Sequence, residues 1–153
     1  MDGIERRRLV SIGKIDSIVT RGETGLAVQW DDGRRAAIDL AAVIAGRPAL
    51  AALADPQVFQ GAQLAGDGWS IEWPGGIDFG SAQLRRWADE QTGEAMPAAD
   101  FRGWIERHGM SLEAAAAALG LSRRTIAYYL SGEQPVPKTV MLATEGFDAR
   151  AAA

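Results

Sequence analysis

The sequence predicts an α+β protein, in which an N-terminal antiparallel sheet with short helices is followed by an all-helical C-terminal domain. Three observations predict this fold class. Short β-branched stretches alternate with Gly- and Asp-bearing turns over the first 80 residues, helical periodicity replaces them from Asp100 onward, and residues 91–99 show neither pattern. We therefore expect an α+β domain at 1–90, a linker at 91–99 and a helical domain at 100–153.

The first strands are expected to form a hairpin with a tight turn. The stretch Ile15–Thr20 is rich in β-branched residues, and Leu26–Trp30 alternates large apolar residues with small or polar ones. Asp32-Gly33 follows, and Asp-Gly between two such stretches is a strong hairpin signal. The return strand is expected at Arg35–Leu40.

Helical and strand patterns then alternate up to the linker. Ala41–Leu53 is mostly helical in character, although a Gly and a Pro interrupt it. Strands are expected at Val58–Ala65 and Trp69–Trp73, on either side of the Gly-Asp-Gly turn at 66–68. Residues 81–91 are expected to form a helix, and the tryptophans are expected to supply much of the apolar core.

The composition excludes several classes of function. The chain has 153 residues, of which 47% are hydrophobic, and it contains no Cys and one His. Disulfides, thiolate zinc sites, Cys nucleophiles and His-rich metal sites are therefore excluded, and we expect no catalytic, metal or cofactor site. No apolar run is long enough for a membrane span and the N-terminus lacks a secretory signal, so a cytoplasmic protein is expected.

The charge is spread unevenly along the chain. The net charge is −4, and residues 1–97 hold ten Lys and Arg against fourteen Asp and Glu. Residues 98–153 hold six of each sign. Neither part is a basic domain, so any DNA binding must depend on where individual Arg side chains are placed.

The segment 111–132 has the spacing of two short helices joined by a tight turn. Ser111 is a natural N-cap for the first helix, and Gly120 stands where that helix must stop. Ser122 then caps a second helix, which ends at Gly132. Two helices of about two turns with a three-residue turn between them form a helix-turn-helix unit.

The residue types divide cleanly between the two faces of this unit. Ala116 is expected where the two helices touch, and the shared core is expected to hold Leu119, Leu121, Ile126 and Tyr129 or Leu130. The first turn of a recognition helix contacts bases and phosphates. Five residues of the second helix are left facing outward, and Ser122 caps the helix that presents them: Arg123, Arg124, Ala127, Tyr128 and Ser131.

The pattern Ser-x4-Ala-x3-Gly-x-Ser-x3-Ile, ending in a Gly, resembles the lambda-repressor/Cro-like (XRE-type) helix-turn-helix family over about residues 100–145. The resemblance implies sequence-specific binding in the DNA major groove, usually as a dimer. It places Arg123, Arg124, Thr125 and Tyr128 at positions that contact bases or backbone. Together with Ser122 and Ser131, these residues make six candidate DNA contacts. Leu112 stands where the family often has a phosphate-binding Gln, so that contact is expected to be missing.

The first half, over about residues 10–88, resembles a bacterial domain family of unknown function. The resemblance rests on Ile15–Val19, the Asp32-Gly33 turn, Asp39-Leu40 and the run Ile71–Asp78, which reads Ile-Glu-Trp-Pro-Gly-Gly-Ile-Asp. Members are similar to components of toxin–antitoxin-type gene pairs, and some carry a C-terminal helix-turn-helix.

Other polar groups have simpler interpretations than catalysis. Asp31-Asp32 is ordinary turn chemistry, and His108 is expected to interact with the C-terminal dipole of its helix. Arg85 and Arg86 are expected on the solvated face of the helix at 81–91, and Arg6–Arg8 is expected to be a solvated terminal cluster.

Together these features predict a non-enzymatic transcriptional regulator that binds double-stranded DNA through its helical domain. It is expected to form a homodimer, with the N-terminal domain serving dimerisation, sensing or binding of a protein partner. The alternative is an antitoxin-like interaction module, in which the tryptophan-rich sheet binds another protein and the helical domain is auxiliary.

Overall fold

The computed structural model describes residues 13–153. The chain divides into two compact units, of which the first ends at Ala88 and the second covers Asp89–Ala153. The basic cluster Arg6–Arg8 lies outside the described residues.

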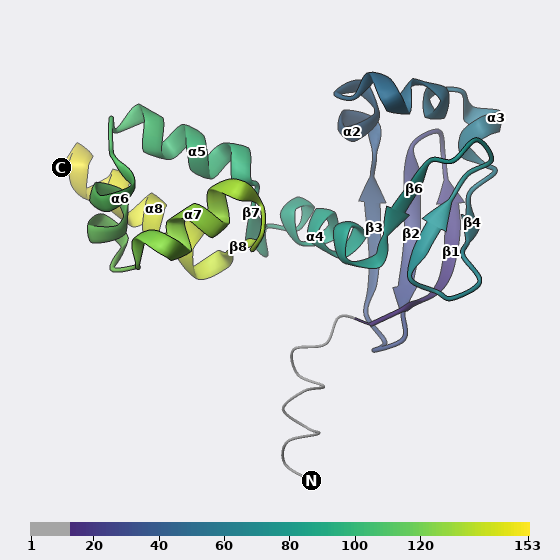
Figure 1. Cartoon of the computed structure of the whole chain (residues 1–153), viewed down its shortest axis with the longest axis horizontal. Coiled ribbons are helices and arrows are strands. Elements are labelled where there is room, and N and C mark those ends of the chain that lie inside the picture. The colour runs from purple at the N-terminus through teal and green to yellow at the C-terminus, as the bar shows by residue number, and fades with distance from the viewer. Residues whose placement is uncertain (1–12) are drawn as a thin grey trace, which may run out of the picture. The chain divides into compact units, whose positions relative to one another are not determined.

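The first unit is built on a three-stranded antiparallel sheet in the order β1-β2-β3 (Figure 1). Its strands are β1 (Ile15–Arg21), β2 (Gly25–Trp30) and β3 (Arg35–Asp39). The expected hairpin turn is confirmed, since Gly33 has a φ of 89° and its N–H donates to the Trp30 carbonyl at 3.0 Å. A positive φ favours Gly at this position because it has no Cβ.

A series of short helices follows the sheet: α2 (Ala41–Ala45), the 3₁₀ helix η1 (Pro48–Ala54) and α3 (Pro56–Phe59). The expected interruption of the helical stretch is confirmed, because α2 ends at Gly46 and η1 begins at Pro48. These elements bury Ile44, Leu50, Leu53 and Phe59 in the core of the unit.

A second antiparallel sheet contains β4 (Gln63–Leu64), β5 (Ser70–Glu72) and β6 (Asp78–Gly80). The prediction of a strand over Val58–Ala65 is wrong for its first part, where Val58 lies in α3. Asp55 accepts a hydrogen bond from the Gln57 N–H at 2.9 Å and Pro56 is the first helical residue, so this N-cap pair starts a helix instead.

Aromatic side chains fill the centre of the first unit, as expected from the tryptophans. Trp73 packs edge-on against Phe79, which in turn packs edge-on against Trp87 of α4 (Ser81–Gln91). Trp30 is completely buried, whereas Trp69 is 46% exposed and is the tryptophan that departs from the expectation. Edge-to-face contacts of this kind stabilise a core in addition to the stabilisation that comes from burying the apolar area of the rings.

Arg85 of α4 is not on a solvated face, which corrects the sequence-based expectation. Its guanidinium lies 5.1 Å from the centre of the Trp30 ring and pairs with the Asp32 carboxylate at 2.7 Å. This ion pair, together with the Arg34 backbone N–H, lowers the pKa of Asp32. Arg85 therefore connects α4 to the hairpin turn between β2 and β3.

The second unit is mainly helical, with α5 (Ala98–Arg107), α6 (Leu112–Leu119), α7 (Arg123–Ser131) and α8 (Lys138–Ala152). A short antiparallel ladder joins β7 (Ala95–Met96) to β8 (Val136–Pro137). The core contains Phe101, Trp104, Ile105, Ala115, Ala116, Ile126, Tyr129, Val136 and Val140.

The stretch 91–99, predicted as a linker, carries short regular elements. It contains the end of α4, the strand β7 and the beginning of α5. The β7–β8 ladder has two residues in each strand, so it is too short to show an alternating pattern in the sequence.

A buried hydrogen-bond relay in the first unit gives a stability prediction. The Trp30 Nε1–H donates to Ser81 Oγ at 3.0 Å, and the Ser81 hydroxyl donates to the Gly13 carbonyl at 2.7 Å. Ser81→Ala leaves a buried donor and an acceptor unpaired, so we expect the free energy of unfolding to fall by about 1–3 kcal/mol. Urea denaturation of the full chain measures this loss.

The exposed Ser17→Ala substitution is the matched control and should change stability by no more than about 0.5 kcal/mol. In a double-mutant cycle with Trp30→Phe, the combined loss of stability should be smaller than the sum of the two single losses. The reason is that Trp30→Phe removes the N–H that Ser81→Ala leaves unpaired. Strictly additive losses would contradict the relay.

Candidate nucleic-acid interface

The first helix of the candidate interface, α6, is defined by a cap at each end. Ser111 Oγ accepts a hydrogen bond from the Ala114 N–H at 3.1 Å. At the other end Gly120 has a φ of 70°, and the Leu121 N–H donates back to the Ala116 carbonyl at 2.9 Å. This left-handed C-cap ends the helix and turns the chain toward α7.

The second helix, α7, repeats the same scheme. Ser122 Oγ accepts from the Thr125 N–H at 3.1 Å and lies 2.9 Å from the Thr125 hydroxyl. The helix ends at Gly132, which has a φ of 80°. Both helices therefore begin at the expected Ser and end at the expected Gly, so the predicted boundaries are confirmed.

The predicted contact between α6 and α7 is also confirmed. Ala116 is 7% exposed and Ile126 is completely buried. Tyr129 packs edge-on against Phe101 of α5, and burial raises the pKa of its hydroxyl. Leu119, Leu121 and Leu130 are partly buried against the same core. Small residues at the crossing let the two backbones approach closely, and this approach fixes which face of α7 points outward.

The outward face of α7 carries both candidate arginines. Arg123 and Arg124 are exposed, as are Ser122 and Ser131, while Thr125 and Tyr128 are partly buried. All six candidates therefore lie on one helix and its cap, and the arginines lie in the first turn. The N-terminal end of a helix carries partial positive charge, which adds to that of the two guanidinium groups.

Each arginine makes one contact that the sequence does not predict. Arg123 Nε lies 2.8 Å from Glu113 Oε1 of α6, and both side chains are more than 60% exposed. Arg124 Nε donates to the Tyr128 hydroxyl at 2.9 Å, and its guanidinium lies 5.6 Å from the centre of the Tyr128 ring. Neither guanidinium is folded beneath neighbouring protein.

The hydroxyl groups of the other candidates serve the helix itself. Ser122 and Thr125 bond to each other at the cap. Ser131 Oγ donates to the Tyr128 carbonyl at 3.1 Å and accepts from the Glu133 N–H at 3.3 Å. The candidates whose side chains take no part in the hydrogen bonds at the two ends of α7 are therefore Arg123, Arg124 and Tyr128.

A second polar cluster ties α8 to α5. Asp148 Oδ1 accepts a hydrogen bond from Trp104 Nε1–H at 2.9 Å and lies 2.7 Å from His108 Nε2. Arg107 lies 3.7 Å from the other oxygen of the same carboxylate. Hydrogen bonding from His108 is the largest cause that lowers the pKa of Asp148. His108 therefore holds two helices together, and the sequence offered no sign of this partner 40 residues away.

Neither a metal site nor a membrane-spanning helix is present in residues 13–153. No group of three or more His, Asp or Glu in this part of the chain is arranged to hold a metal ion. None of its helices combines the length and the apolar character that crossing a membrane requires.

Comparisons with known proteins match both units. Residues 15–90 match the family described as "Protein of unknown function (DUF2442)", and residues 102–146 match the helix-turn-helix family HTH_3. The chain is similar to the crystal structure of "Putative DNA Binding Protein NE0471" from Nitrosomonas europaea ATCC 19718. The identity is 32% and the TM-score 0.52, over 89% of this chain and 86% of that one. The chain belongs to the DUF2442 family and carries a helix-turn-helix domain.

Both family resemblances found in the sequence are thus confirmed, and the HTH_3 match covers α6 and α7 completely. No curated protein matches the chain. Neither family description names an enzymatic activity, and the DUF2442 unit has no assigned role.

The Asp148 cluster of the helix-turn-helix unit predicts a pH-dependent stability. Because its pKa is lowered in the folded state, this carboxylate stabilises the fold above its ordinary pKa, and the contribution is lost as the pH falls through the lowered value. Asp148→Asn cannot ionise, so its urea midpoint should lie below that of the wild type at pH 6. The gap should close as the pH falls below about 4.

The control is Glu145→Gln, which replaces an exposed carboxylate on the same helix and should shift the midpoint little. A gap that persists unchanged to about pH 2 would contradict the role assigned to the Asp148 charge.

Proposed function

We propose that the chain is a sequence-specific, DNA-binding transcriptional regulator that acts as a dimer. Its helix-turn-helix unit binds the major groove through α7, and its DUF2442 unit serves dimerisation or sensing. The observation that carries the proposal is the pair of exposed arginines in the capped first turn of α7. The match to HTH_3 and the similarity to NE0471 support it. A bacterial regulator of this kind acts in the cytoplasm.

The contact between Arg123 and Glu113 is compatible with DNA binding. Both side chains are well exposed, and ion pairs between exposed groups contribute little to stability. The guanidinium can therefore exchange this carboxylate for a phosphate or a guanine edge. Charge-assisted, bidentate bonds of Arg to such groups are among the strong contacts of protein–DNA interfaces.

Tyr128 positions the second arginine. The phenol oxygen accepts the Nε–H of Arg124 and the guanidinium lies over the ring, so the side chain is oriented before DNA arrives. Less rotational freedom is then lost on binding. We assign Arg123 and Arg124 to base or phosphate contacts, Tyr128 to positioning and contact, and Ser122 and Thr125 to presenting the first turn. Ser131, at the far end of α7, is assigned a contact with the DNA backbone.

The overall charge of the protein does not favour DNA binding. The net charge is −4, and Leu112 has no polar group with which to bind phosphate. A single unit should therefore bind weakly, and a dimer on a two-fold operator doubles the number of contacts.

The first test replaces both arginines in the full chain. A duplex is selected from a random library with the wild type, and fluorescence anisotropy then measures its Kd. Arg123→Ala together with Arg124→Ala should weaken binding at least about thirtyfold, because each good Arg–base contact contributes roughly 1–3 kcal/mol. The slope of log K against log salt should fall by about 2 if both contact phosphates.

Arg150→Ala is the matched control, since it removes one exposed arginine from α8 of the same unit and should leave the Kd unchanged. The melting temperature of the double variant should stay near that of the wild type. Unchanged operator affinity in a folded double variant would overturn the proposal.

A second test concerns Glu113. Glu113→Gln removes the carboxylate that pairs with Arg123, so the arginine no longer has to leave an ion partner when it binds DNA. We expect tighter binding to the selected duplex, by about two- to fivefold, since exposed pairs are weak. The same substitution in the Arg123→Ala background should have a smaller effect. An equal gain in both backgrounds would show that Glu113 acts through general repulsion alone.

A further inference from the structure

The β1-β2-β3 sheet has one face turned toward the core and one turned away from it. On the core side, Leu26, Val28 and Ile38 are buried. The residues between them form three cross-strand rows on the other side. From one end of the sheet to the other, these rows are Arg21–Gly25–Asp39, Val19–Ala27–Ala37 and Ser17–Gln29–Arg35. We name these nine residues the outer face.

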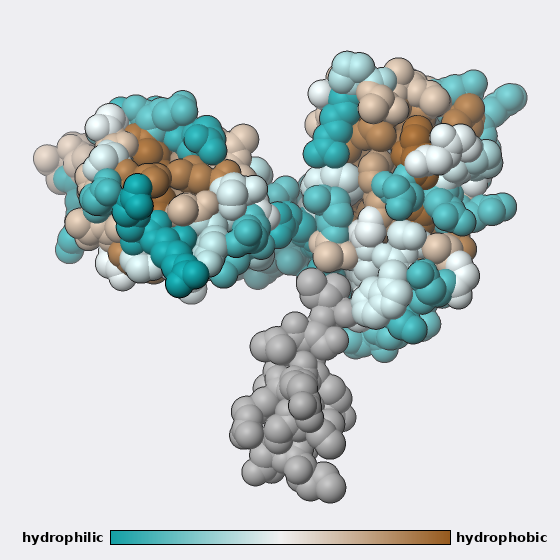
Figure 2. All heavy atoms as spheres, viewed as in Figure 1, coloured by the Kyte–Doolittle hydropathy of each residue, from teal (hydrophilic) through white to brown (hydrophobic). Residues whose placement is uncertain are grey.

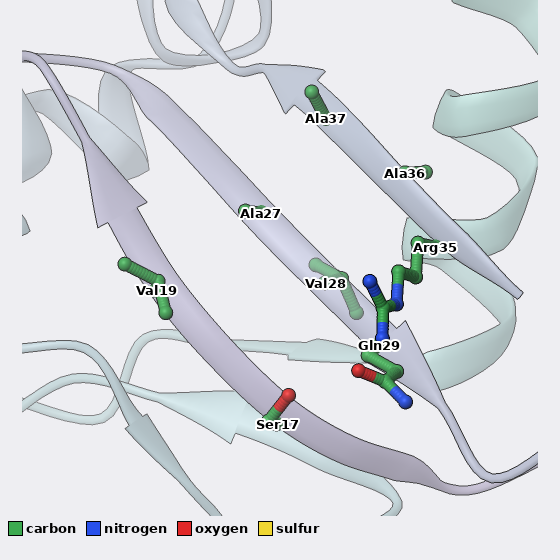
Figure 3. A pocket seen from close by; sticks show the side chains of 8 residues that line it. All are labelled: Ser17, Val19, Ala27, Val28, Gln29, Arg35, Ala36 and Ala37. Atoms are coloured by element: carbon green, nitrogen blue, oxygen red, sulfur yellow. The ribbon is translucent and has the colours of Figure 1, made fainter. Parts of the chain in front are cut away.

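The middle row of the outer face is apolar. Val19 is 53% exposed, one of three exposed large hydrophobic residues in the described part of the chain, and it stands beside Ala27 and Ala37 (Figure 3). Because the two alanines are small, the surface is hollowed over them, and the depression has a volume of about 440 Å³. On the side of the molecule that Figure 2 shows, hydrophobic side chains reach the surface among hydrophilic ones.

The polar rows carry charges at the edges of the sheet. One row has Arg21 on β1 and Asp39 on β3, and the other has Ser17 on β1 and Arg35 on β3. The Ala41 N–H and the Thr24 hydroxyl both bond to Asp39, which lowers its pKa and keeps it ionised at neutral pH. Both edge strands therefore carry charged side chains on either side of the apolar middle row.

We propose that the outer face binds the outer face of a second copy of this chain, with the two-fold axis parallel to the strands and passing over β2. An isologous contact requires a surface that complements itself. Under this operation each row faces itself, and β1 of one copy faces β3 of the other. The contact would form the dimer of the proposed function and rests on that proposal.

The outer face meets this requirement in every row. In the middle row Val19 faces Ala37 of the second copy, so the protruding side chain lies over the hollow, and Ala27 faces its own counterpart. In the first polar row Arg21 faces Asp39 of the second copy, twice by symmetry. In the other, Arg35 faces Ser17, and the Gln29 amides face each other and can exchange hydrogen bonds. No row brings like charges together.

The size of the face sets the strength of the dimer. Three strands that are spaced about 4.8 Å apart and have five to seven residues each cover roughly 300 Å² in each copy. Stable interfaces usually bury about 800 Å² in each partner. The dimer should therefore be weak and depend on concentration, and binding of two copies to one operator would stabilise it by mass action.

The test measures self-association of the full chain by sedimentation velocity, without DNA, over a concentration series that reaches the millimolar range. The wild type should shift from monomer to dimer as concentration rises. Val19→Glu places a carboxylate in the apolar row and should abolish the shift. Leu142→Glu is the matched control, since it charges an equally exposed hydrophobic residue on α8 and should leave the shift unchanged.

Two substitutions at one position test the pairing itself. Ser17→Asp places a carboxylate opposite Arg35 of the second copy and should tighten the dimer about two- to thirtyfold, since two exposed ion pairs form by symmetry. Ser17→Lys places like charges there and should weaken it. A general loss of structure would move both variants in the same direction. If the two copies met about a different axis, Ser17 would not face Arg35, and the two variants would dimerise to the same extent.

Three outcomes would overturn the inference: a chain that stays monomeric throughout the series, a dimer that Leu142→Glu breaks and Val19→Glu does not, or a Val19-dependent complex with a different protein only. Failure of the proposed function is distinguishable, because loss of DNA binding in the arginine variants is measured separately. A chain that dimerises through Val19 but binds no duplex would keep this inference and reject the regulator.

Discussion

The backbone corner between α6 and α7 is the constraint on which the candidate interface depends. Gly120 adopts a φ of 70°, and the Leu121 N–H bonds back to Ala116 within the preceding helix. A Cβ at Gly120 would meet nothing within 4 Å, so the requirement for glycine is conformational and not steric. Because the corner fixes the angle between the helices, it also decides that Ile126 and Tyr129 are buried while Arg123 and Arg124 stay outside.

The structural features that could be predicted from the sequence are those that depend on residues close together in the chain. The serine caps, the two glycine ends and the apolar positions of α6 and α7 follow from spacing within about twenty residues, and the Asp32-Gly33 turn follows from a dipeptide. What the sequence missed are mainly pairings between side chains of different elements. Glu113 with Arg123, Arg85 with Trp30, and Asp148 with His108 all join residues of different elements, and periodicity carries no information about which faces will meet. The two-residue strands β7 and β8 were missed because alternation needs a longer run to be visible.

His108 illustrates how a sound local interpretation can be incomplete. It does stand at the C-terminal end of α5, where a positive charge would be favourable. Its ring, however, packs edge-on against both Trp104 and Phe147, and its Nε2 lies against the Asp148 carboxylate. A carboxylate only accepts hydrogen bonds, so this nitrogen carries the proton. The single histidine of the chain thus serves to fasten the last helix to the rest of its unit.

If α7 binds DNA as proposed, the carboxylate of Glu113 competes with the DNA for Arg123. Any nucleic acid that approaches Arg123 must offer more than the protein already supplies, and an arbitrary stretch of DNA offers only phosphate. Breaking this pair costs the same for every DNA that engages Arg123, so it lowers the affinity for all sequences by a similar factor. An operator that also presents a matching base edge adds a contact that random DNA lacks. Under the proposed function, this arrangement would shorten the stay of the protein at random positions along the chromosome and leave more copies free to search.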